Sequence, residues 1–299
     1  MRRLPVVHML RFAATLLVVL VPSGSQAVTI DGRLDPEYGA PIATQSVQTH
    51  DNDALVNTHN LQSSGSELDE AFGFIARDTL FVLMAGNLGD YVGNQPSKDM
   101  HQFLLLDTGA PGQNVIVPGA ALDLFRIGGL TLDAGFQASY ALVSSWAGSG
   151  LNEEFCALPP GGPGTGYTVG TLIWSSPQGS SVSGGPDGIQ AGVDNSSLAG
   201  VTYGCDASSG AGVTSGIEWM VPLAAIGHPA GCVRVCALIF DGNYVTNQVL
   251  ASVPVGTCSL GPPSSASFAA TSGDQFFSIC SAQTSIHSST WGTLKIRYR

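Results

Sequence analysis

A pair of carboxylates is the one catalytic arrangement that this sequence offers, because its histidines are scattered. Glycoside hydrolysis needs two of them facing one sugar, roughly 5–9.5 Å apart. Glu218 alternates with Ile217 and Trp219, which predicts a strand position with Glu218 facing solvent. The acids that could supply such a pair are Glu153, Glu154, Glu218, Asp107 and Asp241. No motif gives any two of them a role, so the sequence favours a non-catalytic protein and leaves a carboxylate-based glycosidase open.

The sequence has no motif for catalysis by a serine nucleophile, for a zinc protease or for nucleotide binding. The sequence contains no G-x-S-x-G, no H-E-x-x-H, and neither a P-loop nor a Rossmann glycine pattern. Calcium is the one metal with a candidate donor set, because Ca²⁺ takes hard oxygen ligands from loops. Those candidate ligands are Asp51, Asp53, Asp187 and Asp194. Neither the loop with Asp51 and Asp53 nor the loop with Asp187 and Asp194 has EF-hand spacing. The alternative is that these residues only form turns, in which Asp and Asn are common.

Aromatic side chains near loops or strand ends could act as stacking platforms for sugar rings. The candidates are Tyr140, Trp146, Tyr167 and Trp174. The alternative for each is a place in the core, which is where aromatic rings of a β-sandwich often lie. We therefore expect these residues to form the ligand-binding surface if the chain binds glycan.

The cysteines predict a disulfide framework. An even number in an exported chain argues for three bridges among Cys156, Cys205, Cys232, Cys236, Cys258 and Cys280. Cys232 and Cys236 share a predicted strand, where four steps separate them by about 13 Å, too far to pair with each other. One pairing joins each of them to Cys258 or Cys280 and leaves Cys156 with Cys205, although six cysteines allow 15 connectivities.

Short apolar runs between clusters of Gly, Pro, Ser, Asn and Asp predict the elements that position these residues. Many runs are apolar on consecutive residues, as in strands buried on both faces. Two short helical turns are expected over 119–124 and 222–226, and long polar loops over 161–167, 175–188 and 261–273. Strands are expected over 71–76, 79–85, 102–107, 138–144, 168–174, 216–221, 233–240, 275–279 and 294–298. This pattern predicts an all-β, antiparallel, jelly-roll-like sandwich.

The first residues predict export. Arg2, Arg3 and Arg11 precede an apolar run over 12–21, and Ser25-Gln26-Ala27 forms an A-x-A-like cleavage site. We expect a signal peptide over 1–27, no transmembrane segment after cleavage, and one decorated sandwich over 28–299. Two smaller sandwiches divided near residue 150 are the alternative. The basic end over 290–299 is read as a last edge strand, with a sorting signal as the other reading.

Charge excludes some partners. The chain carries a net charge of −11, and the leader would remove three of its 11 Lys and Arg residues and none of its 22 acids. An acidic surface repels phosphates and anionic lipid, so we expect no nucleic-acid partner. Charged residues make up only 11% of the chain, against about 25% in average domains, and a polar, weakly charged surface suits an extracellular location.

The segment Ile30-Asp31-Gly32-Arg33-Leu34-Asp35 resembles the opening of carbohydrate-binding family 9-like and DOMON-like sandwiches, in which I-D-G-x-x-D begins the first strand. More of the chain resembles a group of exported bacterial β-sandwich proteins, a likeness that brings no activity with it. It is carried by the segments 65–73, 106–114, 130–136, 194–201, 216–223 and 244–250. Taken together, the sequence predicts a secreted binding module for extracellular glycan or another surface polymer. The alternative is a structural or adhesive component of the cell surface or matrix.

Overall fold

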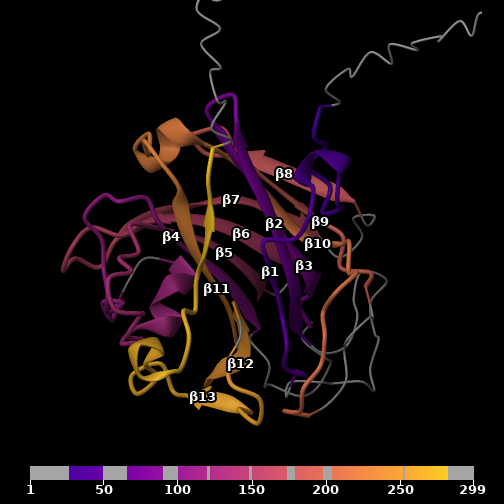
Figure 1. Cartoon of the computed structure of the whole chain (residues 1–299). Helices are drawn as coiled ribbons and strands as arrows, with labels where there is room; N and C mark the ends of the chain where they lie inside the picture. The colour runs from indigo at the N-terminus through magenta and orange to yellow at the C-terminus, as the bar shows by residue number, and fades with distance from the viewer. Residues whose placement is uncertain are drawn as a thin grey trace, which may run out of the picture.

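Two antiparallel sheets pack face to face in the computed structural model of this chain (Figure 1). The structure describes residues 27–49, 66–89, 100–119, 122–147, 150–173, 179–197, 204–251 and 253–281. The predicted all-β sandwich is therefore confirmed. Each sheet takes strands from both sides of residue 150.

The smaller sheet has six strands in the order β1-β2-β3-β10-β9-β8. Their bounds are β1 Ala43–Thr44, β2 Glu67–Ala76, β3 Thr79–Asn87, β8 Ser180–Gly184, β9 Ile189–Val193 and β10 Gly216–Pro222. The larger sheet has eight strands in the order β13-β12-β11-β4-β5-β6-β7, and β14 pairs with part of β11. Their bounds are β4 His101–Asp107, β5 Tyr140–Ala147, β6 Gly150–Ala157, β7 Thr165–Ile173, β11 Val233–Phe240, β12 Val245–Leu250, β13 Ser259–Gly261 and β14 Phe277–Ile279.

Helical structure in the described residues is limited to short 3₁₀ turns. These are η1 Pro36–Tyr38, η2 Leu122–Ile127, η3 Leu223–Ile226 and η4 Phe268–Ala270. The helical turns expected over 119–124 and 222–226 correspond to η2 and η3. Within the described residues, none of the helices has the length and apolar character needed to cross a membrane.

The β2–β3 hairpin shows how local sequence sets the register. Arg77 and Asp78 connect the strands with φ of 50° and 56°, the pair of positive values that defines a type I′ turn. This turn has the right twist for a two-residue hairpin, and it forms here without glycine. Phe74 and Phe81 consequently face each other across the strands, with ring centroids 4.9 Å apart.

The middle of the eight-stranded sheet is buried on both faces. Leu104 and Leu106 of β4 face the core between the sheets, whereas Phe103 and Leu105 face a second core. That second core is covered by loop residues such as Leu132 and Phe136 and by η4. Consecutive apolar residues in β4, β5 and β11 follow from this double burial, as the sequence predicted.

Glycines allow the sandwich to close at one edge, where β7 of one sheet lies against β8 of the other. A Cβ on Gly184 would lie 2.2 Å from the backbone oxygen of Val169, and one on Gly170 would lie 2.6 Å from the Cβ of Val182. No side chain fits in either space.

The prediction of a loop over 175–188 is wrong in its middle, because residues 180–184 form β8 and pair with β9.

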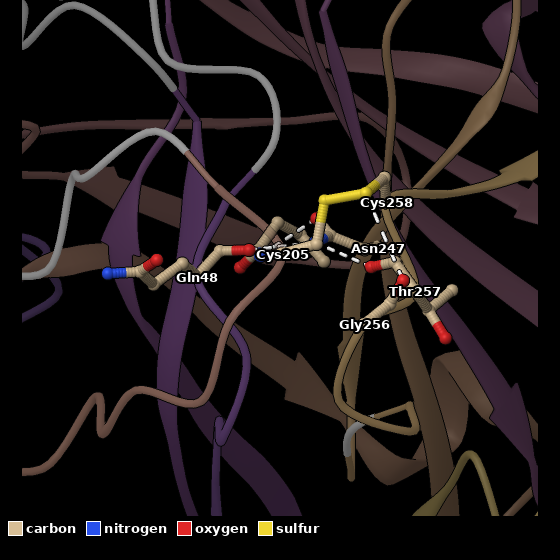
Figure 2. Close-up of a disulfide and its surroundings, with 7 residues drawn as sticks. Gln48, Cys205, Asn247, Gly256, Thr257 and Cys258 are labelled. Atoms are coloured by element: carbon tan, nitrogen blue, oxygen red, sulfur yellow. Dashed lines mark hydrogen bonds between the residues drawn. A yellow bond between two sulfur atoms is a disulfide. The ribbon is translucent and has the colours of Figure 1, made fainter.

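A strap formed by residues 45–49 and 204–210 links the two sheets near the opposite edge. Its two halves exchange backbone hydrogen bonds, including Gln48 N–H to Asp206 O at 2.9 Å. Figure 2 shows how the strap is tied to the eight-stranded sheet: the amide of Asn247 on β12 donates to the backbone oxygens of Gln48 at 2.7 Å and Thr257 at 3.0 Å. The Cys205–Cys258 disulfide lies directly beside these bonds.

The disulfide framework has two bridges rather than three. Cys205 pairs with Cys258 and Cys232 with Cys280, whereas Cys156 and Cys236 are buried thiols. The prediction that Cys156 pairs with Cys205 is wrong. A bridge between the two thiols is also impossible. Cys236, Leu105, Ala141 and Cys156 lie side by side on four successive strands, so about 14 Å separates the outer two.

Candidate functional site

Trp146 lies inside the sandwich, which contradicts its predicted exposure. The residue is 6% exposed, it packs in the core between the sheets, and its indole N–H donates to the backbone oxygen of Leu88 at 3.0 Å. Strand β5 points Leu142 and Trp146 to the same inner face. Its neighbour among the predicted platforms, Trp174, lies outside the described residues.

Tyr140 and Tyr167 are half-buried and flank Phe155 on the inner face of the eight-stranded sheet. Their ring centroids are 5.7 Å and 5.6 Å from that of Phe155. The Tyr167 hydroxyl donates to Asp187 Oδ2 at 2.9 Å. The pKa of Tyr167 is raised, mainly by burial and to a smaller extent by this hydrogen bond to the carboxylate. The bond joins β7 to the β8–β9 turn, so it holds the two sheets together at the closing edge. A ligand-binding role for either tyrosine stays a prediction.

The two predicted calcium ligands that the structure describes, Asp187 and Asp194, do not converge. Asp51 and Asp53 lie outside the described residues. Asp187 and Asp194 sit at opposite ends of the extended strand β9, roughly 20 Å apart along the chain. Asp194 is paired instead with Arg33, whose Nε lies 2.5 Å from its Oδ2. Across the part of the chain that the structure describes, no three His, Cys, Asp or Glu side chains gather to hold a metal ion.

The acids considered for a glycosidase pair are dispersed over the fold. Glu153 and Glu154 point to opposite faces of β6, because they are consecutive in a strand. Asp107 pairs with Arg234, and Asp241 accepts the N–H groups of Asn243 and Tyr244 in a turn. None of these acids faces another as a hydrolytic pair.

Glu218 lies on the outer face of β10, as its alternation predicted, but it is fully buried rather than solvated. The N-terminal segment covers it: the N–H groups of Asp31 and Gly32 donate to its Oε2 at 2.9 and 3.0 Å, and the Tyr38 hydroxyl donates to Oε1 at 2.7 Å. Burial raises the pKa of Glu218 to about 7 against the opposing effect of these bonds. The I-D-G segment forms no strand of its own. It contributes a single bridge from Arg33 to Ser215.

An acid cluster that the sequence did not reveal surrounds Asp123 of η2. Ser145 donates its hydroxyl to Asp123 Oδ2 at 2.5 Å, His101 Nε2 lies 3.5 Å from the same oxygen, and the Asp123 N–H donates to Glu154 Oε2 at 3.0 Å. Burial raises the pKa of Glu154 to about 7. Burial also works to raise the pKa of Asp123, but hydrogen bonds from His101 and Ser145 outweigh it and lower that pKa. Only knowledge of which loop covers the sheet could have placed Asp123 beside Glu154.

This cluster does not have the geometry of a catalytic triad. In a triad the histidine lies between serine and aspartate and takes the serine proton. Here Asp123 lies between Ser145 and His101, and a carboxylate of lowered pKa is a poor base for a hydroxyl. Ser145, His101 and Glu154 are at most 5% exposed, so a sugar would have no access to them. The arrangement anchors η2 to the sheet.

One further candidate site is a hollow on the outer face of the six-stranded sheet, with a volume of about 340 Å³. The stacked rings of Phe74 and Phe81 form part of its wall, and the Tyr38 ring meets Phe74 edge-on at 5.2 Å. Polar groups of Glu37 and Thr79 stand beside the rings. The hollow is lined by Ala27, Val28, Glu37, Phe74, Ala76, Arg77, Thr79, Phe81 and Met220. Sequence reasoning missed this site, because Phe74 and Phe81 lie within predicted strands and both rings are half-buried at the end of a hairpin.

Comparison of the chain with known protein families, with curated proteins and with solved structures found no match in any of the three.

Proposed function

We propose that this protein is a secreted, non-catalytic module that binds extracellular glycan, and that the hollow beside Phe74 and Phe81 receives a sugar ring. The observation that carries the proposal is the composition of the hollow wall. A sugar ring has apolar C–H faces and polar hydroxyl edges. The hollow offers aromatic rings for the former, with a carboxylate at Glu37, a hydroxyl at Thr79 and a guanidinium at Arg77 for the latter.

The same wall supports binding without hydrolysis. Glycoside cleavage requires two carboxyl groups on either side of one bond. Among the residues that line the hollow, Glu37 is the one carboxylate. The other acid cluster, at Asp123 and Glu154, lies on the other sheet. Two disulfides are in keeping with an extracellular protein.

A glycan array probed with oxidised protein starting at Val28 tests the proposal. Phe74→Leu and Phe81→Leu remove a ring while keeping an apolar side chain, so we expect each to weaken binding at least tenfold. Phe125→Leu is the matched control, because Phe125 is 48% exposed on η2 of the other sheet and should bind as the parent does. Melting curves establish that all variants are folded.

The outcomes separate the proposed role from its alternatives. If folded parent protein binds no glycan, the proposal is wrong and a structural or adhesive role takes its place. If glycan binds and only Tyr140→Phe or Tyr167→Phe weakens it, the site lies at the closing edge of the sandwich instead. Release of sugar from bound glycan would contradict the non-catalytic part.

A further inference from the structure

The start of the described chain lies against an unsatisfied carboxylate. Val28 and Glu37 line the same hollow as Phe74 and Phe81, and the Val28 side chain packs against the buried cluster that includes Tyr38. Oε2 of Glu37 is buried and makes no hydrogen bond within the described residues. A buried carboxylate oxygen without a donor costs free energy, so this position favours a cationic or N–H partner.

The segment next to Val28 is fixed in place. The Thr29 N–H donates to Asp35 Oδ2 at 2.8 Å, and Asp31 and Gly32 donate to Glu218 on β10. Asp35 and Pro36 lead directly into η1, which carries Glu37. Val28 and Glu37 are therefore held by the same short stretch of chain, on the same side of the sheet.

We infer that cleavage between Ala27 and Val28 creates the missing partner: the new α-ammonium of Val28 pairs with the Glu37 carboxylate at the rim of the hollow. A signal peptidase adds one water across this peptide bond. Ala27 keeps the new carboxylate and leaves with the leader, and Val28 keeps the amine, which takes up a proton near neutral pH. Before cleavage the same nitrogen is a neutral amide with a single hydrogen. After cleavage it is a cation with three donors.

Cleavage also changes the shape of the hollow. Ala27 is exposed and forms part of its wall. Its departure with the leader opens that side, while Val28 remains packed against the aromatic rings. Processing would thus lock the first residue of the mature chain in place and open the hollow in one step. This inference does not depend on glycan binding.

The test is a double-mutant cycle on stability. Four proteins are cut from a fusion by a protease that leaves no extra residue: chains that start at Val28 or at Ala27, each with Glu37 or with Glu37→Gln. With Glu37 present, we expect the chain that starts at Val28 to melt about 2 °C higher in low salt, as a half-buried ion pair would give in a domain of this size. The difference should vanish with Glu37→Gln and shrink in 1 M NaCl.

Two controls keep the result specific. Asp35→Asn weakens the anchor of Thr29 but retains Glu37, so it should lower both melting temperatures and preserve their difference. The protein secreted by a bacterial host with its own leader should begin at Val28 in mass spectra. An equal difference with Glu37→Gln, no difference at all, or a secreted chain that begins elsewhere would overturn the inference.

Discussion

Gly32 and Glu218 are 186 residues apart in sequence, yet the N–H of Gly32 donates to Glu218 Oε2 at 3.0 Å. Gly32 has φ of +79° and lies so close to the sheet that a Cβ would be 2.1 Å from the Asp194 backbone nitrogen. The N-terminal segment can cover Glu218 only because Gly32 has no side chain.

A matched pair of glycine variants tests this close approach. Gly39 has φ of +72° but nothing within 4 Å of a Cβ, whereas Gly32 is crowded by backbone. Both alanine variants carry the cost of positive φ, which is at least about 1–2 kcal/mol and is higher for Gly39, whose ψ of −141° lies outside the left-handed helical region. We expect Gly32→Ala to lose at least about 2 kcal/mol more than Gly39→Ala in urea unfolding, because the segment must lift off Glu218. Equal losses would show that the approach is not tight.

Stability should fall as pH rises, because several buried carboxyls hold their protons more tightly in the folded state. Burial raises the pKa of Glu67 to about 9 and that of Asp69 to about 7. Glu154 and Glu218 are likewise raised to about 7. The unfolded chain loses these protons near pH 4, so between about pH 4 and 9 the folded state binds more protons, and deprotonation favours unfolding.

Urea unfolding at pH 5, 7 and 9 measures this trend, and we expect the free energy of unfolding to be highest at pH 5. Each proton bound only by the folded state contributes a slope of at most about 1.4 kcal/mol per pH unit. Glu67→Gln should flatten the curve between pH 7 and 9. Asp274→Asn, at an exposed position, should leave it unchanged. A free energy that rises from pH 5 to 9 would contradict this assignment of raised pKa values.

The strands were predictable because short apolar runs mark them directly. The direction of each side chain was harder to predict: β4, β5 and β11 carry apolar residues on both faces, so the alternation that separates inside from outside is missing from these strands. Trp146 was placed at the surface because the strand was expected to end at residue 144, whereas β5 runs to Ala147. Contacts that join distant segments, such as Asp123 with Glu154 or Cys205 with Cys258, depend on how loops cross the sheets. No local pattern in the sequence encodes them.

The disulfide assignment predicts a defined pattern of labelling. Alkylation of denatured, unreduced protein should modify Cys156 and Cys236 only, as mass spectra of peptides would show. Replacing Cys205 and Cys258 by serine should cost about 2–4 kcal/mol, because their bridge closes a loop of 53 residues and ties the strap to the eight-stranded sheet. A Cys156→Ala/Cys236→Ala variant should lose stability in reductant as the parent does. Protection of Cys156 and Cys236 from alkylation would contradict the assignment of two bridges and two thiols.

The buried hydrogen bond between Ser144 and Glu153 can be tested for its net contribution to the free energy of unfolding. Glu153 is fully buried between the sheets, where Oε2 accepts the Ser144 hydroxyl at 2.6 Å and Oε1 has no hydrogen-bond partner among the residues that the structure describes. Burial raises the pKa of Glu153 well above its ordinary value, which favours the uncharged acid. Ser144→Ala removes its bonded partner and should cost about 1–3 kcal/mol.

Adding Glu153→Met to Ser144→Ala should recover most of that loss, because the double variant removes both polar groups and fills the space with an apolar chain of similar length. Urea unfolding of the single and double variants gives the coupling between the two sites. If the double variant is less stable than Ser144→Ala alone, Glu153 makes a favourable contribution beyond its bond to Ser144. The pair would then be part of a larger polar network between the sheets.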